Sequence, residues 1–201
     1  MGIYSIKPLF QKSLAPLKRI LVKWKVSPTA INLLALLISI SGGLAIYYSQ
    51  YYIILLIYVP FMAFIRTALN ALDGLVAREL KVKNQKFGEV LNEFTDRLSD
   101  ISIFSAFIFM PQVNTYLASA TLVIILTNSY LSILSKAAGG KRQYGGLVGK
   151  ADRMIYLGIF SIIVLITSNF NILNYFLAFI SLATIITLIQ RFIATKGELY
   201  R

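Results

Sequence analysis

Apolar residues fall into six long runs separated by short polar stretches. The runs extend over about residues 29–49, 51–72, 88–110, 113–135, 152–168 and 172–193. Each is close to the roughly 20 residues that an α-helix needs to cross the hydrocarbon core of a bilayer. The pattern therefore predicts an all-α integral membrane protein with six transmembrane helices, organised as a single domain over residues 1–201.

An amphipathic segment precedes the first run. Within residues 1–27, apolar side chains recur at steps of three and four, and basic residues occupy the opposite face. This pattern is typical of an interfacial helix lying on the cytoplasmic leaflet, and Pro16 should kink or divide it. We expect Ser27 to cap the first span, with Pro28 at its first helical position. Residues 28–201 would then form the six-span bundle.

Charge is distributed very unevenly between the two ends of the predicted spans. The chain carries 20 Lys and Arg against eight Asp and Glu, yet the turns around Gln50, Gln112 and Asn169 contain no charge. By the positive-inside rule, both termini and both long loops are cytoplasmic in a multi-pass protein of the cell membrane. Topology and anionic lipid also account for the net charge of +12, so we expect membrane lipid rather than nucleic acid as a partner.

Composition restricts the chemistry that the chain can perform. The sequence is 57% hydrophobic and contains no cysteine and no histidine. These absences exclude disulfides, thiolate nucleophiles, imidazole bases and zinc sites of the Cys/His type. Acid–base or metal chemistry must therefore use carboxylates, amides and hydroxyls.

Acidic residues concentrate around one short basic loop within residues 70–100. Its apolar flanks carry five of the eight carboxylates, namely Asp73, Glu89, Glu93, Asp96 and Asp100. Ionisable groups at membrane depth are costly, so such a cluster indicates a functional site whose charge is offset by a partner. Oxygen ligands without nitrogen or sulfur favour Mg²⁺ or Mn²⁺, and Ca²⁺ could also bind.

The spacing of these residues places their oxygen atoms on shared helix faces. Asn70 and Asp73 are three apart at the end of the second run. In the third run, residues at steps of four form a stripe that begins with a glycine and continues with oxygen-bearing side chains, namely Gly88, Asn92, Asp96 and Asp100. The predicted metal ligands are Asp73, Asn70, Asn92 and Asp96, with Glu93 and Asp100 as further candidates that could supply missing charge.

A simpler interpretation involves no metal. Arg66, Arg78 and Arg97 could neutralise the carboxylates without any reaction. Paired arginines do not explain, however, why a glycine and acidic side chains repeat with one helical period. Arg66 lies within the second run, and the sequence leaves open whether it is an ion-pair partner or a phosphate ligand.

The second long loop is rich in glycine and basic residues. A flexible backbone with cations beside an acidic site could bind a phosphate group of a substrate. The same residues could equally be positive-inside residues in a mobile loop. The candidates for phosphate binding are Lys141, Arg142, Lys150 and Arg153.

The segment from Asn70 to Asp96 resembles the signature of the CDP-alcohol phosphotransferase family. That signature reads Asp-x-x-Asp-Gly-x-x-Ala-Arg, then eight or nine residues, then Gly-x-x-x-Asp-x-x-x-Asp. The run from Asp73 to Arg78 matches, nine residues follow, and Gly88 and Asp96 match as well. Asn70 and Asn92 stand where the family has its first and third aspartates.

The resemblance implies transfer of a phospho-lipid group from a CDP-diacylglycerol-type donor to an alcohol or phospho-alcohol, with release of CMP in phospholipid synthesis. It assigns Asp73 to divalent metal at the diphosphate and Asp96 to the general base. Gly74 and Ala77 would allow close approach of the nucleotide, and Arg78 would support the site. The resemblance also implies a homodimer.

Two other functions remain open from the sequence. The asparagines at positions 70 and 92 permit a catalytically weakened homologue that binds CDP-lipid or a partner enzyme without turnover. A small transporter could use carboxylates as an ion site, but such sites form at mid-membrane in broken helices. Here the carboxylates are expected near the cytoplasmic ends of the spans.

Overall fold

The structure, a computed structural model, describes residues 7–81 and 85–200, and these residues contain helices and no strands. In chain order the helices are α1 (Lys7–Ser13), α2 (Ala15–Lys23), α3 (Pro28–Tyr48), the 3₁₀ helix η2 (Ile53–Ile57), α4 (Tyr58–Glu79), α5 (Gln85–Ile108), α6 (Thr115–Ala137), α7 (Lys150–Thr167) and α8 (Ile172–Leu199).

All six predicted apolar runs form long helices. Within the described part of the chain, four segments are long and apolar enough to cross a membrane, namely α3, the η2–α4 segment, α6 and α8. The other two long helices carry more charge: α5 contains the acidic stripe, and α7 begins with Lys150 and continues with Asp152 and Arg153. The structure thus supports an all-helical membrane protein with four evident spans, whereas the count of six stays a prediction for α5 and α7.

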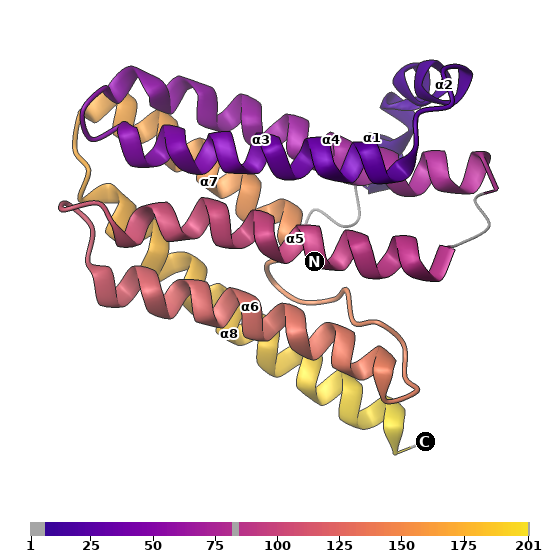
Figure 1. Ribbon diagram of the computed structural model, residues 1–201. Helices are drawn as coiled ribbons and strands as arrows, with labels where there is room; N and C mark the ends of the chain where they lie inside the picture. Colours follow the sequence, from indigo (N-terminus) through magenta and orange to yellow (C-terminus); the bar gives the residue numbers. More distant parts are fainter. Residues whose placement is uncertain (1–6, 82–84, 201) are drawn as a thin grey trace.

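The six long helices form a bundle in which helices that follow one another along the chain run in opposite directions (Figure 1). The three short connections, α3 to α4, α5 to α6 and α7 to α8, lie together at the left end in Figure 1. These are the turns without charged residues. Helix α3 packs against α4 and α5, α6 packs against α5 and α8, and α7 packs against α4 and α8.

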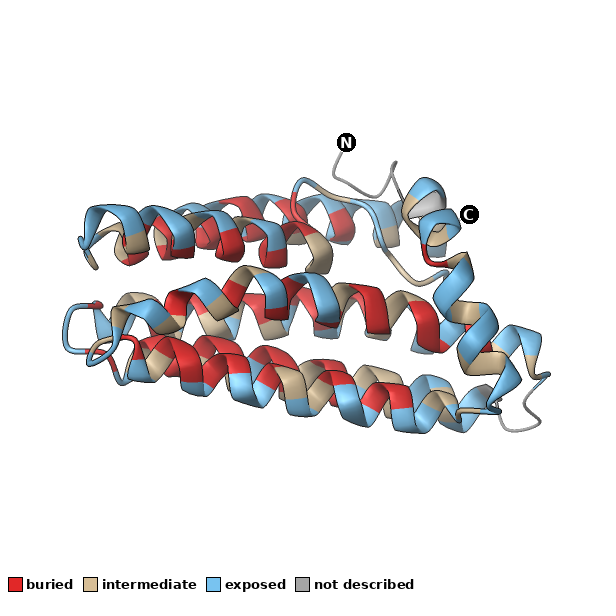
Figure 2. Cartoon of the chain, turned by 90° about the horizontal axis from the view of Figure 1, so that it is seen from above, coloured by how far each residue is buried: buried red, intermediate tan, exposed pale blue. Residues whose placement is uncertain are grey.

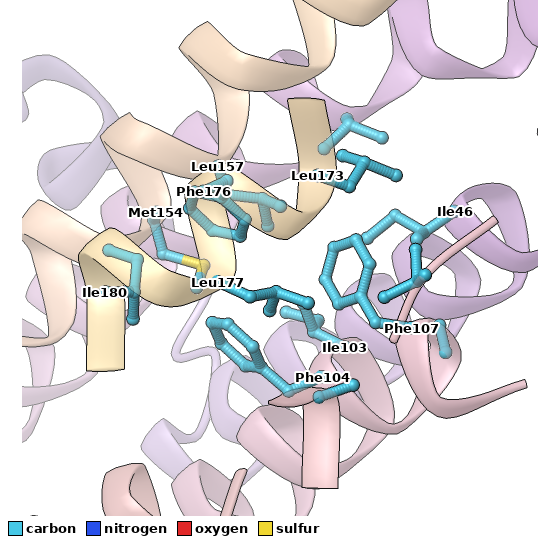
Figure 3. Close-up of a cluster of buried hydrophobic side chains, with 14 of the residues drawn as sticks. Ile46, Ile103, Phe104, Phe107, Met154, Leu157, Leu173, Phe176, Leu177 and Ile180 are labelled. Carbon is cyan, nitrogen blue, oxygen red and sulfur yellow. The ribbon is translucent and has the colours of Figure 1, made fainter. Parts of the chain in front are cut away.

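Aliphatic side chains and a group of phenylalanines form the apolar core of the bundle (Figure 3). The ring centroid of Phe176 on α8 lies 6.4 Å from that of Phe104, 6.0 Å from that of Phe107 and 5.3 Å from that of Phe160. Rings at these separations contribute attraction beyond the burial of their surface. This contact joins α5, α7 and α8, so the charged helices α5 and α7 share the apolar core.

Large apolar side chains also cover much of the outer surface. Buried residues lie where helices face one another, and exposed residues lie on the outward faces (Figure 2). Leu37 is 62% exposed, Phe61 63%, Ile166 77% and Leu182 66%. Such a surface is what lipid, rather than water, would cover.

The amphipathic segment forms two helices, and the break at Leu14 lies two residues before Pro16. Division of this segment was therefore predicted correctly. Leu14 packs with an apolar cluster formed by α3 and α4, and Lys18 forms an ion pair of 3.0 Å with Glu79. Its position on a bilayer surface stays a prediction, and residues 1–6 lie outside the described part. The Ser27 cap is confirmed, because its hydroxyl accepts a hydrogen bond of 3.1 Å from the backbone N–H of Ala30.

One glycine sets the contact between α3 and α5. A Cβ atom on Gly43 would lie 2.1 Å from the backbone oxygen of Ser102. Only glycine permits the two backbones to approach so closely, as is common where membrane helices cross. The contact holds α5, which carries half of the sequence motif, against α3.

Candidate active site

The two halves of the motif meet at the charged end of the bundle. Asp73 on α4 and Asp96 on α5 are both buried, at 5% and 6% exposure. Their like charges repel each other. Asn70, Asn92 and Asp96 line a cavity of about 660 Å³. The structure thus brings Asn70, Asn92 and Asp96 together at one cavity, and Asp73 interacts with Asp96 from outside the lining.

Lys150 interacts with both motif carboxylates. Its ammonium group pairs with Asp96 and also interacts with Asp73. The position of Lys150 follows from the start of α7: the chain enters the helix at Gly149, whose N–H donates a 2.7 Å hydrogen bond to the carboxylate of Asp152. This cap fixes Lys150 as the first residue of the helix.

The oxygen atoms at this site fit a hard divalent cation. The side-chain oxygen Oδ1 of Asn92 is buried and has no hydrogen-bond partner, which is costly for an amide unless it has a ligand. Among residues 7–81 and 85–200, no three acidic side chains gather closely enough to hold an ion by themselves. A cation would therefore need the amide oxygens of Asn70 and Asn92 beside the carboxylates of Asp73 and Asp96.

Asp100 lies in an arginine cluster. One of its oxygens accepts a hydrogen bond of 2.9 Å from Arg66, and the other lies 3.2 Å from Arg153 and 3.8 Å from Arg97. Asp100, Arg66 and Arg153 are almost completely buried. Both oxygens of Asp100 are thus engaged by arginines, and the structure places Arg66 as an ion-pair partner that joins α4 to α5.

Glu93, the other candidate for extra charge, is also paired. It forms an ion pair with Arg142 from the loop between α6 and α7, and Arg142 lies 4.7 Å from the centre of the Tyr144 ring. Glu89 lies at the protein surface and pairs with Lys136. The extra carboxylates of α5 are therefore matched by cations of the protein itself.

The glycine-rich loop of residues 138–149 is held by side chains of α6 and α8. Ser135 donates a 2.9 Å hydrogen bond to the backbone oxygen of Lys141, whose N–H donates to Glu198 over 3.0 Å. Arg191 donates to the backbone oxygen of Gly145 over 2.8 Å, and the N–H of Val148 donates to Thr187 over 2.9 Å. These contacts argue against the interpretation of this segment as a mobile loop.

The predicted phosphate ligands occupy different positions. Arg142, Lys150 and Arg153 line the cavity, whereas the Lys141 side chain is exposed and outside its lining. Gly74, Ala77, Arg78 and Gly88 also lie outside the lining. Among the described residues, no atom outside the glycine's own stretch of helix comes within 4 Å of a Cβ atom built on Gly74 or Gly88, so packing against these residues does not explain the two glycines.

One wall of the cavity was not predicted from the sequence. It consists of Ser129 and Ser132 on α6 and Arg191 on α8. Two signals were available: small polar residues recur along one face of an apolar helix, and an arginine lies within the last apolar run. Neither signal indicates by itself which way the residue faces.

An apolar groove extends from the polar cavity between α4 and α7. Phe64, Ile155, Ile159 and Ile162 line it, and their exposure ranges from 41% to 61%. Pro60 and Gly158 form its floor, because a Cβ atom on Gly158 would lie 3.2 Å from Pro60. The polar cavity thus continues into an apolar groove on the outer face of the bundle.

Among known proteins, the sequence is similar to an inner membrane protein and to a synthase of an inositol phosphate lipid. Inner membrane protein YnbA of Escherichia coli (strain K12) is 37% identical over 166 residues, which cover 83% of this chain and 82% of the relative. Archaetidylinositol phosphate synthase of Pyrococcus horikoshii is 28% identical over 194 residues, 96% of each chain.

The fold is similar to that of phosphatidylinositol phosphate synthase of Mycobacterium tuberculosis. Its crystal structure with CDP-DAG superimposes with a TM-score of 0.73 and 22% identity, covering 91% of this chain and 93% of that one. A second crystal structure of that protein, with manganese and citrate, gives a TM-score of 0.74 and covers 91% and 88% of the two chains. The sequence matches CDP-alcohol phosphatidyltransferase over residues 25–195. This chain therefore belongs to the CDP-alcohol phosphatidyltransferase family.

Proposed function

We propose that the protein transfers a phosphatidyl-type group from a CDP-activated lipid to an alcohol and releases CMP. The observation that carries this proposal is the continuity of the cavity. Carboxylates, amide oxygens and cations line one part of it, and an apolar groove between α4 and α7 forms the other. A lipid joined to a nucleotide likewise has a charged diphosphate part, which suits the polar part of the cavity, and hydrocarbon chains, which suit the apolar groove.

The donor would lie along this polar-to-apolar axis. Its hydrocarbon chains would occupy the groove beside Phe64 and Ile159, where burial of apolar surface favours binding. The diphosphate would lie at Asp73 and Asp96 through a divalent cation, with Gly74 and Gly88 leaving room for close approach of the nucleotide. The CDP-DAG bound to the M. tuberculosis protein supports this class of donor.

The acceptor would bind at the basic part of the cavity. Arg142, Arg153 and Arg191 line it, with Ser129 and Ser132 beside them. Guanidinium groups bind phosphate through paired hydrogen bonds, and serine hydroxyls suit a polyol. These features favour a phosphorylated alcohol, and two relatives have names that refer to inositol phosphate products.

In the proposed reaction, Asp96 accepts the proton of the acceptor hydroxyl. The hydroxyl oxygen forms a bond to the β-phosphorus of the donor, and the bond from that phosphorus to the bridging oxygen of CMP breaks. A divalent cation held by Asp73, Asn70, Asn92 and Asp96 would neutralise negative charge on the diphosphate. Mg²⁺ and Mn²⁺ are the proposed ions, and the manganese in the M. tuberculosis structure supports this choice.

We further propose six spans, with the termini and the active site on the cytoplasmic side. The connection from α6 to α7, which carries Lys141 and Arg142, lies away from the charge-free turns (Figure 1), and Arg142 and Lys150 line the cavity. Helices α1 and α2 would lie along the cytoplasmic leaflet, and pairing of two chains through their spans is part of the same proposal.

The test is an assay of CMP release by the purified protein. The full chain in lipid nanodiscs receives a CDP-lipid with diacyl or diether chains, Mg²⁺ or Mn²⁺, and one alcohol. The alcohols are inositol phosphate, glycerol 3-phosphate and their unphosphorylated counterparts. We expect CMP and a new phospholipid in equal amounts, with the phosphorylated acceptors favoured. If the protein binds CDP-lipid but releases CMP with none of the acceptors, it is a binding protein that does not catalyse the transfer.

A further inference from the structure

The charges around the cavity are nearly balanced before any metal ion binds. Buried or half-buried cations that line it or pair with its lining are Arg66, Arg97, Arg142, Lys150, Arg153 and Arg191. The corresponding anions are Asp73, Glu93, Asp96, Asp100 and Asp152. Six cations against five anions leave one net positive charge in this set of residues around the cavity.

Few of these anions are free to receive a metal ion. Asp100 is engaged by Arg66 and Arg153, and Glu93 is engaged by Arg142. Asp152 accepts the N–H of Gly149 at the start of α7. Asp73 and Asp96 are the remaining carboxylates of this set, and Asp96 itself pairs with Lys150 and lies 4.0 Å from Arg97. Asn70 and Asn92 add oxygen atoms without charge.

The ammonium group of Lys150 already neutralises part of the negative charge of Asp73 and Asp96. This group pairs with Asp96, interacts with Asp73 and is held at the first position of α7 by the Gly149–Asp152 cap. Two divalent ions would bring four positive charges to two carboxylates, within surroundings that already carry excess positive charge. One divalent ion would raise the net charge of this set from +1 to +3, whereas two ions would raise it to +5. Repulsion between like charges at such separations is strong in a poorly solvated site.

We propose that this site binds a single divalent cation per chain and that the ammonium group of Lys150 supplies the positive charge that a second ion would otherwise bring. Two-ion sites are common in phosphoryl chemistry. Here Asn70, Asn92 and the Lys150–Asp96 pair together favour one ion and one ammonium group. The inference rests on the proposed function, because the ion and Lys150 would share the phosphates of the donor.

The inference is tested by counting bound Mn²⁺ on the purified full chain without substrate. Electron paramagnetic resonance of free Mn²⁺ gives the number of sites and their dissociation constants. We expect one Mn²⁺ per chain in the wild type. Lys150→Met should keep one ion and bind it at least about tenfold more tightly, since a positive charge beside Asp96 is removed. Lys150→Arg should match the wild type. Asn70→Asp combined with Asn92→Asp should bind a second ion.

Lys18→Met serves as the matched control, because Lys18 pairs with Glu79 outside the cavity lining. Its Mn²⁺ binding should equal that of the wild type. Two ions in the wild type, no bound ion, or equal Mn²⁺ affinity in the wild type and Lys150→Met would each overturn the inference. The proposed transfer reaction is judged separately by CMP release. A chain that binds two ions and releases CMP would therefore disprove the inference alone.

Discussion

At the residue scale, each half of the motif contributes one carboxylate to the candidate site. Asp73 comes from α4 and Asp96 from α5, and both helices pack against α3. The two residues have different neighbours, however. Asp73 accepts the backbone N–H of Gly74, whereas Asp96 pairs with Lys150. The proposed roles, ion binding for Asp73 and proton transfer for Asp96, predict different defects.

Asp73→Asn should reduce CMP release at least tenfold, a change in barrier of about 1.4 kcal/mol or more. The reason is that Asp73 is the one carboxylate on the α4 side of the proposed ion. The rate of CMP release and the thermal unfolding midpoint, measured on the same preparation, check this. Glu89→Gln is the control, because Glu89 is an exposed carboxylate paired with Lys136. Retention of more than about a tenth of the activity would remove Asp73 from its proposed role.

Asp96→Asn should stop transfer to the acceptor and leave CDP-lipid binding largely intact. A base is needed to take the acceptor proton, but the donor is bound mainly by other groups. Donor binding by calorimetry and CMP release on the same sample separate the two effects. If donor binding falls as severely as in Asp73→Asn, Asp96 acts first as a ligand of the ion.

At the element scale, the position of α5 depends on its crossing with α3. Gly43 allows α3 to approach the backbone of α5 at Ser102, which lies two residues after Asp100. The Arg66–Asp100 pair fixes α5 against α4 in the same region. A packing contact and an ion pair thus hold the acidic stripe of α5 in register with Asp73.

Gly43→Val should destabilise the fold by about 2 kcal/mol or more, because the added side chain must push the two backbones apart. Thermal unfolding in nanodiscs measures the effect. Gly197→Ala is the control: in the described part of the chain, no atom outside its own stretch of α8 lies within 4 Å of a Cβ atom built on Gly197, and alanine is the better helix former. Equal stability of Gly43→Val and the wild type would show that the α3–α5 contact is looser than described.

At the scale of the whole molecule, charge and cavity lie at the same end of the bundle. The turns near Gln112 and Asn169 lie at the opposite end (Figure 1). Because the natural chain contains no cysteine, single cysteines can report orientation without any background.

Gln112→Cys and Asn169→Cys should react with a membrane-impermeant maleimide in intact cells. Ser13→Cys and Ala138→Cys should react only after the membrane is opened, because the positive-inside rule places them in the cytoplasm. All four positions are exposed in the structure. Labelling of Ala138→Cys in intact cells would contradict the proposed orientation, and wild-type protein is the unlabelled control.

The sequence by itself determined the features that depend on local periodicity. Apolar runs, the Ser27 cap and the division near Pro16 follow from side chains a few residues apart, and the structure contains all of them. The motif spacing also placed Asn70, Asn92 and Asp96 on faces that line one cavity. Helical geometry repeats regularly, so neighbours along the chain suffice for such predictions.

Only the tertiary structure decided how the charges pair and what surrounds the motif. Asp100 was a candidate ion ligand by spacing, but Arg66 and Arg153 reach it from two other helices. Lys150 reaches Asp96 across 54 positions of the chain, and Arg191 completes a wall that the sequence did not indicate. Which helix faces meet depends on packing of the whole bundle, and a buried charge takes the partner that this packing provides.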